Sequence, residues 1–84
     1  MKFQVEFLYE RDSEAYVFAR RQEAGDFSLS AQSRLGTAAL GPSVTQPRKI
    51  RPDRSPDLDI FAFVLKDRRD LATFSVGQIV ELHP

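Results

Sequence analysis

Apolar and polar residues alternate along much of the chain, and this period of two is typical of a strand that buries one face. The first such segment places four large side chains on one face: Phe3, Val5, Phe7 and Tyr9. The same alternation predicts two further strands: residues 15–22 and 27–32. The polar segments 10–14 and 23–26 are predicted turns, and Gly25 suits the second because it can adopt a positive φ without strain.

The second half of the chain contains a more apolar strand. Residues 58–66 are apolar on both faces beyond Asp59, so they are predicted to form the most buried strand. A last strand is predicted over 78–82 and a helical turn over 67–72, and no helix longer than about two turns is expected. Residues 35–40 fit either a short strand or a helical turn.

These elements predict an all-β fold, a small closed or partly open Greek-key β-barrel of about six strands that forms a single domain over residues 1–84. A barrel is favoured because closure leaves no exposed strand edge. We expect Leu71 and Phe74 to plug one end, and Gly77 to provide a sharp entry into the last strand. Four further positions are expected to be buried around one centre: Phe63 or Phe61, Leu65, Val80 and Leu82.

Residues 41–57 break the strand pattern and are predicted to form a long loop that is rich in proline and basic residues. They hold four of the five prolines: Pro42, Pro47, Pro52 and Pro56. Proline fixes φ and lacks a backbone N–H, so neither a helix nor a central strand fits this segment. Loops of this length are commonly functional or mobile.

Charge is segregated along the chain although twelve basic and twelve acidic residues cancel overall. The residues from Arg34 to Arg54 include five basic side chains and one acidic side chain, so this part has a net charge of +4. The rest of the chain therefore has a net charge of −4. Concentrated Arg and Lys suit phosphates or an acidic protein surface, and a merely solvated loop is the alternative. The predicted partner-binding residues are Arg48, Lys49, Arg51 and Arg54.

No residue pattern indicates catalysis, so we expect a protein that is not an enzyme. His83 is the only histidine and is penultimate in the chain, where a frayed terminus explains it better than acid–base or metal chemistry. Three serines lack a base and fit a solvated strand face better than a nucleophile: Ser28, Ser30 and Ser33. Asp57 and Asp59 share one strand face, but two carboxylates alone make a weak cation site.

Three aromatic residues leave two interpretations open: Tyr16, Phe18 and Phe27. On an exposed sheet they would form a platform for nucleic-acid bases. Inside a small barrel they would belong to the core, which is the commoner place for alternating aromatic residues.

Several classes of protein and ligand are not expected from the sequence. There is no cysteine, so disulfides and thiolate metal sites are excluded. No G-x-x-x-x-G-K-[ST] loop occurs, so we expect no nucleotide cofactor, and nothing suggests another cofactor or a metal. No segment has the roughly 20 apolar residues that cross a bilayer, and the N-terminus lacks a signal-peptide run, so we expect a cytoplasmic protein without membrane contact.

The C-terminal part resembles the closing segment of the second domain of elongation factor Tu and related translational GTPases. The resemblance rests on three motifs over about 20 residues: Phe63-Val64-Leu65-Lys66, Arg69-Asp70-Leu71 and Gly77-Gln78-Ile79-Val80. It implies a closed Greek-key barrel of about six strands and contact with RNA or the ribosome, but no GTPase activity, because the phosphate loop is missing.

A second resemblance covers less of the chain. Phe74 to Gln78 matches the F-x-x-G-Q entry of the flavin-binding barrels of ferredoxin-reductase-like enzymes. The R-x-[YF]-[ST] motif that would hold flavin does not follow, so we interpret the match as shared barrel geometry.

The predicted function is therefore a small binding module. One hypothesis is an RNA or ribosome contact, and the alternative is a protein–protein interaction or assembly module that binds an acidic partner.

Overall fold

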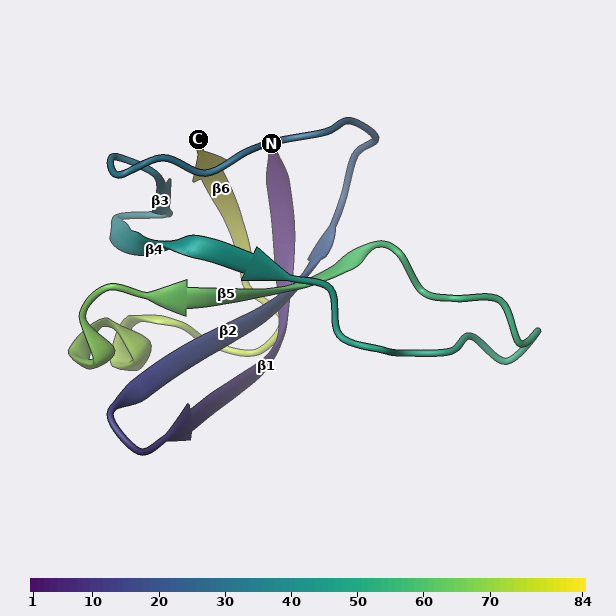
Figure 1. Cartoon of the computed structure of the whole chain (residues 1–84), viewed down its shortest axis with the longest axis horizontal. Helices are drawn as coiled ribbons and strands as arrows, with labels where there is room; N and C mark the ends of the chain where they lie inside the picture. The colour runs from purple at the N-terminus through teal and green to yellow at the C-terminus, as the bar shows by residue number, and fades with distance from the viewer.

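The computed structural model describes all 84 residues and contains six strands and one short helix. The strands are β1 (Lys2–Arg11), β2 (Glu14–Arg21), β3 (Arg34–Leu35), β4 (Ala38–Thr45), β5 (Ile60–Leu65) and β6 (Ile79–His83). They close into a barrel in the order β1-β2-β5-β4-β3-β6, and every pairing is antiparallel (Figure 1). The predicted all-β barrel of six strands is confirmed, and it is closed.

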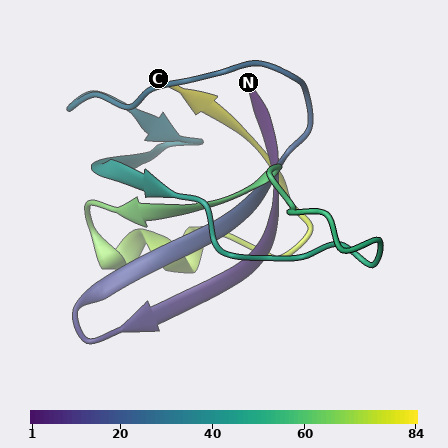
Figure 2. The ribbon, with the colours of Figure 1, turned by 45° about the vertical axis from the view of Figure 1, so that its right-hand side comes forward.

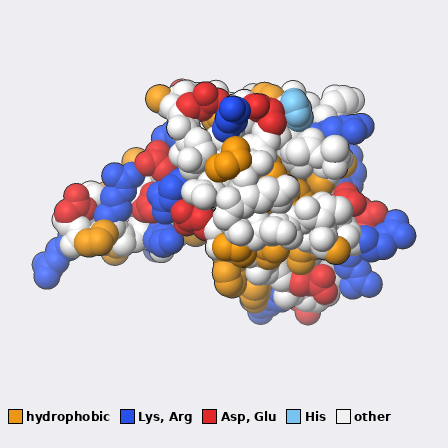
Figure 3. All heavy atoms as spheres, turned by 180° about the vertical axis from the view of Figure 1, so that it is seen from behind, with side chains coloured by type: hydrophobic (Ala, Val, Ile, Leu, Met, Phe, Trp, Pro, Cys, Tyr) orange, Lys and Arg blue, Asp and Glu red, His pale blue; other side chains and the backbone are white.

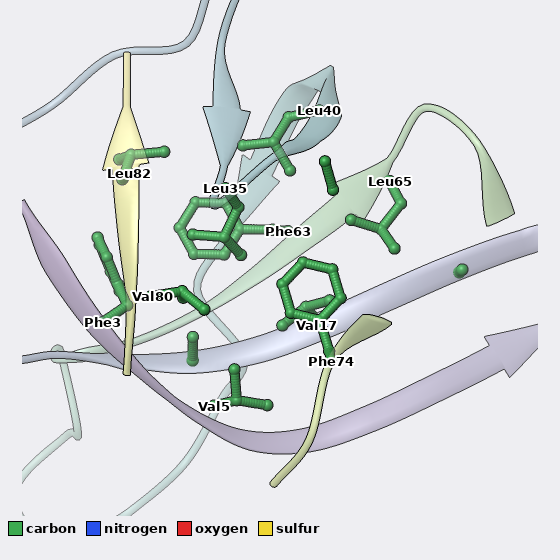
Figure 4. Packing of buried hydrophobic residues seen from close by; sticks show 13 residues of the cluster. Phe3, Val5, Val17, Leu35, Leu40, Phe63, Leu65, Phe74, Val80 and Leu82 are labelled. Atoms are coloured by element: carbon green, nitrogen blue, oxygen red, sulfur yellow. The ribbon is translucent and has the colours of Figure 1, made fainter. Parts of the chain in front are cut away.

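The core occupies the inside of the barrel and is built from the inward side chains of the strands (Figure 4). Phe63 of β5 is completely buried, and its ring makes an edge-to-face contact with Phe3 of β1 at 5.1 Å between centroids. Leu65, Val80 and Leu82 belong to the same cluster, as predicted.

One end of the barrel is closed by the segment between β5 and β6. The 3-10 helix η1 (Arg68–Thr73) starts at Asp67, whose side chain accepts a hydrogen bond from the Arg69 N–H. Phe74 follows it and is 7% exposed within the core cluster, with Leu71 packed against that cluster. The predicted plug is confirmed.

The six-residue helix η1 is the only helix in the structure, and it is too short to cross a membrane.

Gly77 makes the sharp entry into β6 that the sequence predicts. Its φ of 93° lies in the left-handed region, where a Cβ would be strained. Its N–H donates to the Val5 carbonyl at 2.7 Å, which holds the turn against β1.

The predicted strand over 27–32 is wrong. The segment contains no strand, because local side-chain hydrogen bonds take its backbone groups into a turn. The Ser33 hydroxyl accepts from the Ser30 N–H at 2.7 Å, and the Ser30 hydroxyl accepts from the Gln32 N–H at 3.3 Å. The ring of Phe27 nevertheless packs against the core.

The ambiguous residues 35–40 form a hairpin, because Leu35 ends β3 and Ala38 begins β4, with Gly36 at a φ of 62° between them. The predicted loop 41–57 also starts too early, since β4 continues to Thr45. Pro42 fits within this strand because the register of β4 against β5 shifts between Leu40 and Val44. Proline is tolerated at such bulges, where its missing N–H costs no ladder hydrogen bond.

A second bulge corrects the predicted inward face of β1. Val5 pairs with Ala19 of β2, but Phe7 already pairs with Phe18, so one extra residue lies between them. Because side chains alternate, this extra residue turns all later positions of β1 to the opposite face. Phe3 and Val5 are buried as expected, whereas Phe7 and Tyr9 lie outside and are 54% and 40% exposed.

Candidate nucleic-acid interface

The segment between β4 and β5, residues 46–59, projects from the barrel as a long arm (Figures 1 and 2). We call these residues the arm. Its two sides run antiparallel, with a bridge between Ile50 and Pro56. The Asp57 N–H donates to the Lys49 carbonyl at 2.8 Å, and the Arg51 N–H donates to the Ser55 carbonyl at 2.9 Å. The arm is therefore a hydrogen-bonded hairpin.

The tip of the arm is a tight turn. The Arg54 N–H donates to the Arg51 carbonyl at 2.8 Å, and Arg54 has a φ of 69°. Both the N–H and the hydroxyl of Ser55 donate to Asp53 Oδ1, at 3.0 and 2.6 Å. These hydrogen bonds hold the pKa of Asp53 below its usual range, so the carboxylate stays charged and fixes the turn.

The root of the arm is fastened to β2 by ion pairs. The Arg20 guanidinium donates to both carboxylate oxygens of Asp57, at 3.1 and 2.8 Å, and its Nε donates to Glu6 at 2.5 Å. Asp57 is only 5% exposed. The hydrogen bonds from Arg20 lower the pKa of Asp57 to about 2, although its burial acts in the opposite direction.

Asp59 makes the second part of this root. Its carboxylate accepts from Arg21 at 2.8 Å and from Arg51 at 2.6 Å. The hydrogen bond from Arg21 lowers the pKa of Asp59, and the charges of both arginines add to the effect. Asp57 and Asp59, which the sequence offered as a weak cation site, therefore bind arginine side chains instead. No group of three or more His, Cys, Asp and Glu side chains is placed to hold a metal ion.

The four predicted partner-binding residues have different surroundings. Arg51 is bound to Asp59, and Lys49 Nζ lies 3.7 Å from Glu6 Oε1. Arg48 and Arg54 are exposed and make no ion pair. Figure 3 shows basic side chains along the arm, out to its far end. Two of the predicted cations are thus free for a partner, and two already have carboxylates near them.

Four aromatic side chains lie together on the outer surface of β1 and β2, and we call them the aromatic face: Phe7, Tyr9, Tyr16 and Phe18. The centroid of the Phe7 ring lies 6.2 Å from that of Tyr9 and 5.6 Å from that of Phe18. The Tyr9 and Tyr16 centroids are 6.1 Å apart. Tyr16 and Phe18 are placed as the platform interpretation requires, whereas Phe27 is packed with the core on the other side of the barrel wall.

The aromatic face borders the arm. Pro47, Arg48 and Lys49 line one shallow hollow together with Phe7 and Phe18. A neighbouring hollow is lined by Arg11 and by the other two rings of the face. The alternation of β1 predicted that Phe7 and Tyr9 share the face of Phe3 and Val5, because nothing in it signals the bulge that follows Val5.

Two remaining candidates, His83 and Ser33, have surroundings that differ from those predicted. His83 is exposed but lies in β6, where it pairs with Arg34, so the predicted frayed end is wrong. Ser33 is 1% exposed and stabilises the turn described above, so a solvated strand face does not describe it. Comparisons with protein-family models, with curated proteins and with solved structures each found no match to the chain.

Proposed function

We propose that this protein is a cytoplasmic, non-enzymatic module that binds RNA, free or in the ribosome, through its arm. One observation carries the proposal: the arm projects from the barrel with Arg48 and Arg54 exposed and without carboxylate partners. An RNA phosphate supplies the missing anion, because guanidinium groups bind phosphate oxygens with paired hydrogen bonds.

The arm has a defined shape that favours binding to RNA. Its backbone hydrogen bonds and the Arg20–Asp57 pair hold it in a defined shape before binding. Less conformational entropy is then lost when a partner docks than for an unstructured basic loop. The segment from Phe63 to Val80 resembles part of the second domain of translational GTPases. This resemblance supports RNA or the ribosome as the partner, without any GTP chemistry.

The experiment is a comparison of two double variants with the same loss of charge. Arg48→Ser with Arg54→Ser removes the two free cations of the arm. Arg34→Ser with Arg68→Ser removes two exposed cations of β3 and η1, which also make no ion pair. We expect the arm variant to retain less RNA in a pull-down from total RNA, and the control to bind like the parent. Equal binding by both variants would overturn the arm as the contact.

An acidic protein partner is the second candidate, and Ile50 is the observation that favours it. This arm residue is 71% exposed, and large apolar side chains left in water are common at sites where proteins dock. A pull-down with and without nuclease separates the two candidates. Capture through RNA is lost after nuclease treatment, whereas capture of an acidic protein survives it.

A further inference from the structure

We propose that the aromatic face stacks against unpaired bases, so that the ligand of this protein is single-stranded RNA. The inference rests on the proposed function, because it names the form of RNA that is bound. Its site is the outer surface of β1 and β2, and the arm is its neighbour.

Two rings of the aromatic face are strongly exposed to solvent. Phe7 is 54% and Tyr9 is 40% exposed, although both lie on a strand next to a well-filled core. They are stacked on each other with 22° between their planes, so they offer ring faces and edges to a ligand. Bases stack on such rings with little sequence preference, because every base has a π-face.

The sheet surface beneath the rings is well packed. Phe18 pairs with Ala62 of β5, and Arg20 pairs with Ile60, so these β5 residues share the outer face of the sheet. Ile60 is 3% and Ala62 is 5% exposed, although both point away from the core. Pro47 and Lys49 at the start of the arm lie beside Ile60. The face is therefore a packed surface whose shape is set before binding.

Basic side chains border the aromatic face. The two hollows of the aromatic face have three cationic residues in their walls and one acidic residue, Glu6. Glu6 is already engaged by Arg20, at 2.5 Å. Arg11 lies at one end of the face, and Arg48 and Lys49 lie at the other. Glu14 lies beside Tyr16 at the Arg11 end, so phosphates that flank bases stacked on Phe7 and Phe18 would meet Arg48 and Lys49 first.

Single-stranded RNA fits this arrangement better than a duplex. In an RNA duplex the bases are stacked on one another, and only the backbone and the shallow groove are accessible to side chains. A duplex could contact the cations through its phosphates, but its paired bases could not stack on the exposed rings. In a single strand, each unpaired base that reaches the aromatic face adds one stacking contact to the binding.

Intrinsic tyrosine fluorescence can report on binding at the aromatic face. Its only two tyrosines, Tyr9 and Tyr16, both belong to the aromatic face, and it has no tryptophan. Tyrosine emission is therefore recorded while an unstructured RNA 12-mer, or a duplex that contains it, is added at low salt. We expect the single strand to quench the emission and to bind at least about tenfold more tightly than the duplex, because only unpaired bases can stack on the rings.

Two variants and one control complete the experiment. Phe7→Leu and Tyr9→Leu keep apolar side chains at exposed positions but remove stacking. Loss of one stacked base weakens binding by roughly 5- to 150-fold. Ile79→Leu, at a 51% exposed position on β6 outside both hollows, should bind like the parent. Unchanged melting temperatures confirm that the variants are folded.

The outcomes separate this inference from the proposed function. If the parent binds strand and duplex equally, and the leucine variants bind like the parent, the stacking inference is overturned while RNA binding by the arm stands. If the parent binds neither RNA, the proposed function fails and the inference fails with it. Preferential quenching by the single strand that Phe7→Leu weakens supports both.

Discussion

The Arg20 guanidinium of β2 donates two hydrogen bonds to the carboxylate of Asp57, at 3.1 and 2.8 Å, and so joins the barrel to the returning side of the arm. Such two-point pairs are stronger than single hydrogen bonds and fix both distance and orientation. Asp57 is nearly buried, so its charge depends on this partner.

Replacing Arg20 with Met should lower the free energy of unfolding and loosen the arm, because it leaves a buried carboxylate without its main donor. Replacing Arg51 with Met removes a more exposed pair, 44% exposed on the arginine side, and should cost less. Thermal unfolding gives the comparison, and hydrogen exchange of the Arg51 and Asp57 amides reports on the arm. A smaller loss for Arg20→Met than for Arg51→Met would contradict this account of the root.

Acid should destabilise the protein through the same carboxylate. The pKa of Asp57 is about 2 in the folded protein, below its ordinary value of 3.8, so the unfolded chain binds the proton more readily. The stabilisation is complete above about pH 4 and is lost as the pH falls through about 2. The lowered pKa values of Asp59 and Asp67 act in the same direction.

Asp57→Asn isolates this contribution. The variant should be less stable than the parent at neutral pH, and its stability should fall less steeply between about pH 4 and pH 2. Chemical unfolding at several pH values measures both slopes. Parallel slopes for the two proteins would show that Asp57 does not carry the acid dependence.

The plug at the end of the barrel makes a quantitative prediction. Phe74→Ala should cost about 3–5 kcal/mol of unfolding free energy, because truncating a buried Phe removes apolar burial and leaves a cavity. Val76, two residues later, is 66% exposed, so Val76→Ala should change stability by less than about 0.5 kcal/mol. The plug is refuted if Phe74→Ala melts at the same temperature as the parent.

Two glycines provide a test of backbone strain. Gly77 has a φ of 93°, and no atom beyond its two chain neighbours lies within 4 Å of the place that a Cβ would occupy, so Gly77→Ala should cost about 1–3 kcal/mol through its conformation alone. A Cβ on Gly41 would meet Val64 at ordinary contact distances of 3.6–3.8 Å, and its φ is not in the strained region. Gly41→Ala should therefore be nearly neutral in denaturant unfolding. Equal losses at the two positions would contradict this explanation.

The barrel was predictable because its strands carry a clear period of two and its plug carries two apolar residues in a polar connection. The positions of Phe63, Val80 and Phe74 follow from these local signals. The strand predicted over 27–32 failed because Ser30 and Ser33 compete for the backbone hydrogen bonds, and alternation alone cannot reveal that competition.

The candidate site was only half predictable. Proline and arginine content located the arm, but pairing partners decide which of its cations are free, and Asp59 lies eight residues beyond Arg51 on the opposite side of a hairpin. The aromatic face was predictable for Tyr16 and Phe18 as one of two alternatives. For Phe7 and Tyr9 it depends on a bulge, which is fixed by pairing with β2 rather than by the sequence of β1.

The central claim is that the free cations of the arm bind RNA phosphates, and the salt dependence of RNA binding tests it most directly. Binding of the parent to labelled single-stranded RNA is measured at several salt concentrations, beside the Arg48→Ser and Arg54→Ser double variant. Each phosphate contact contributes about −0.7 to the slope of log affinity against log salt. The account predicts tight binding by the parent at low salt and a slope that is shallower by about 1.4 in the double variant, at an unchanged melting temperature. No binding of the parent to RNA or ribosomes at low salt, or identical slopes for the two proteins, would contradict it.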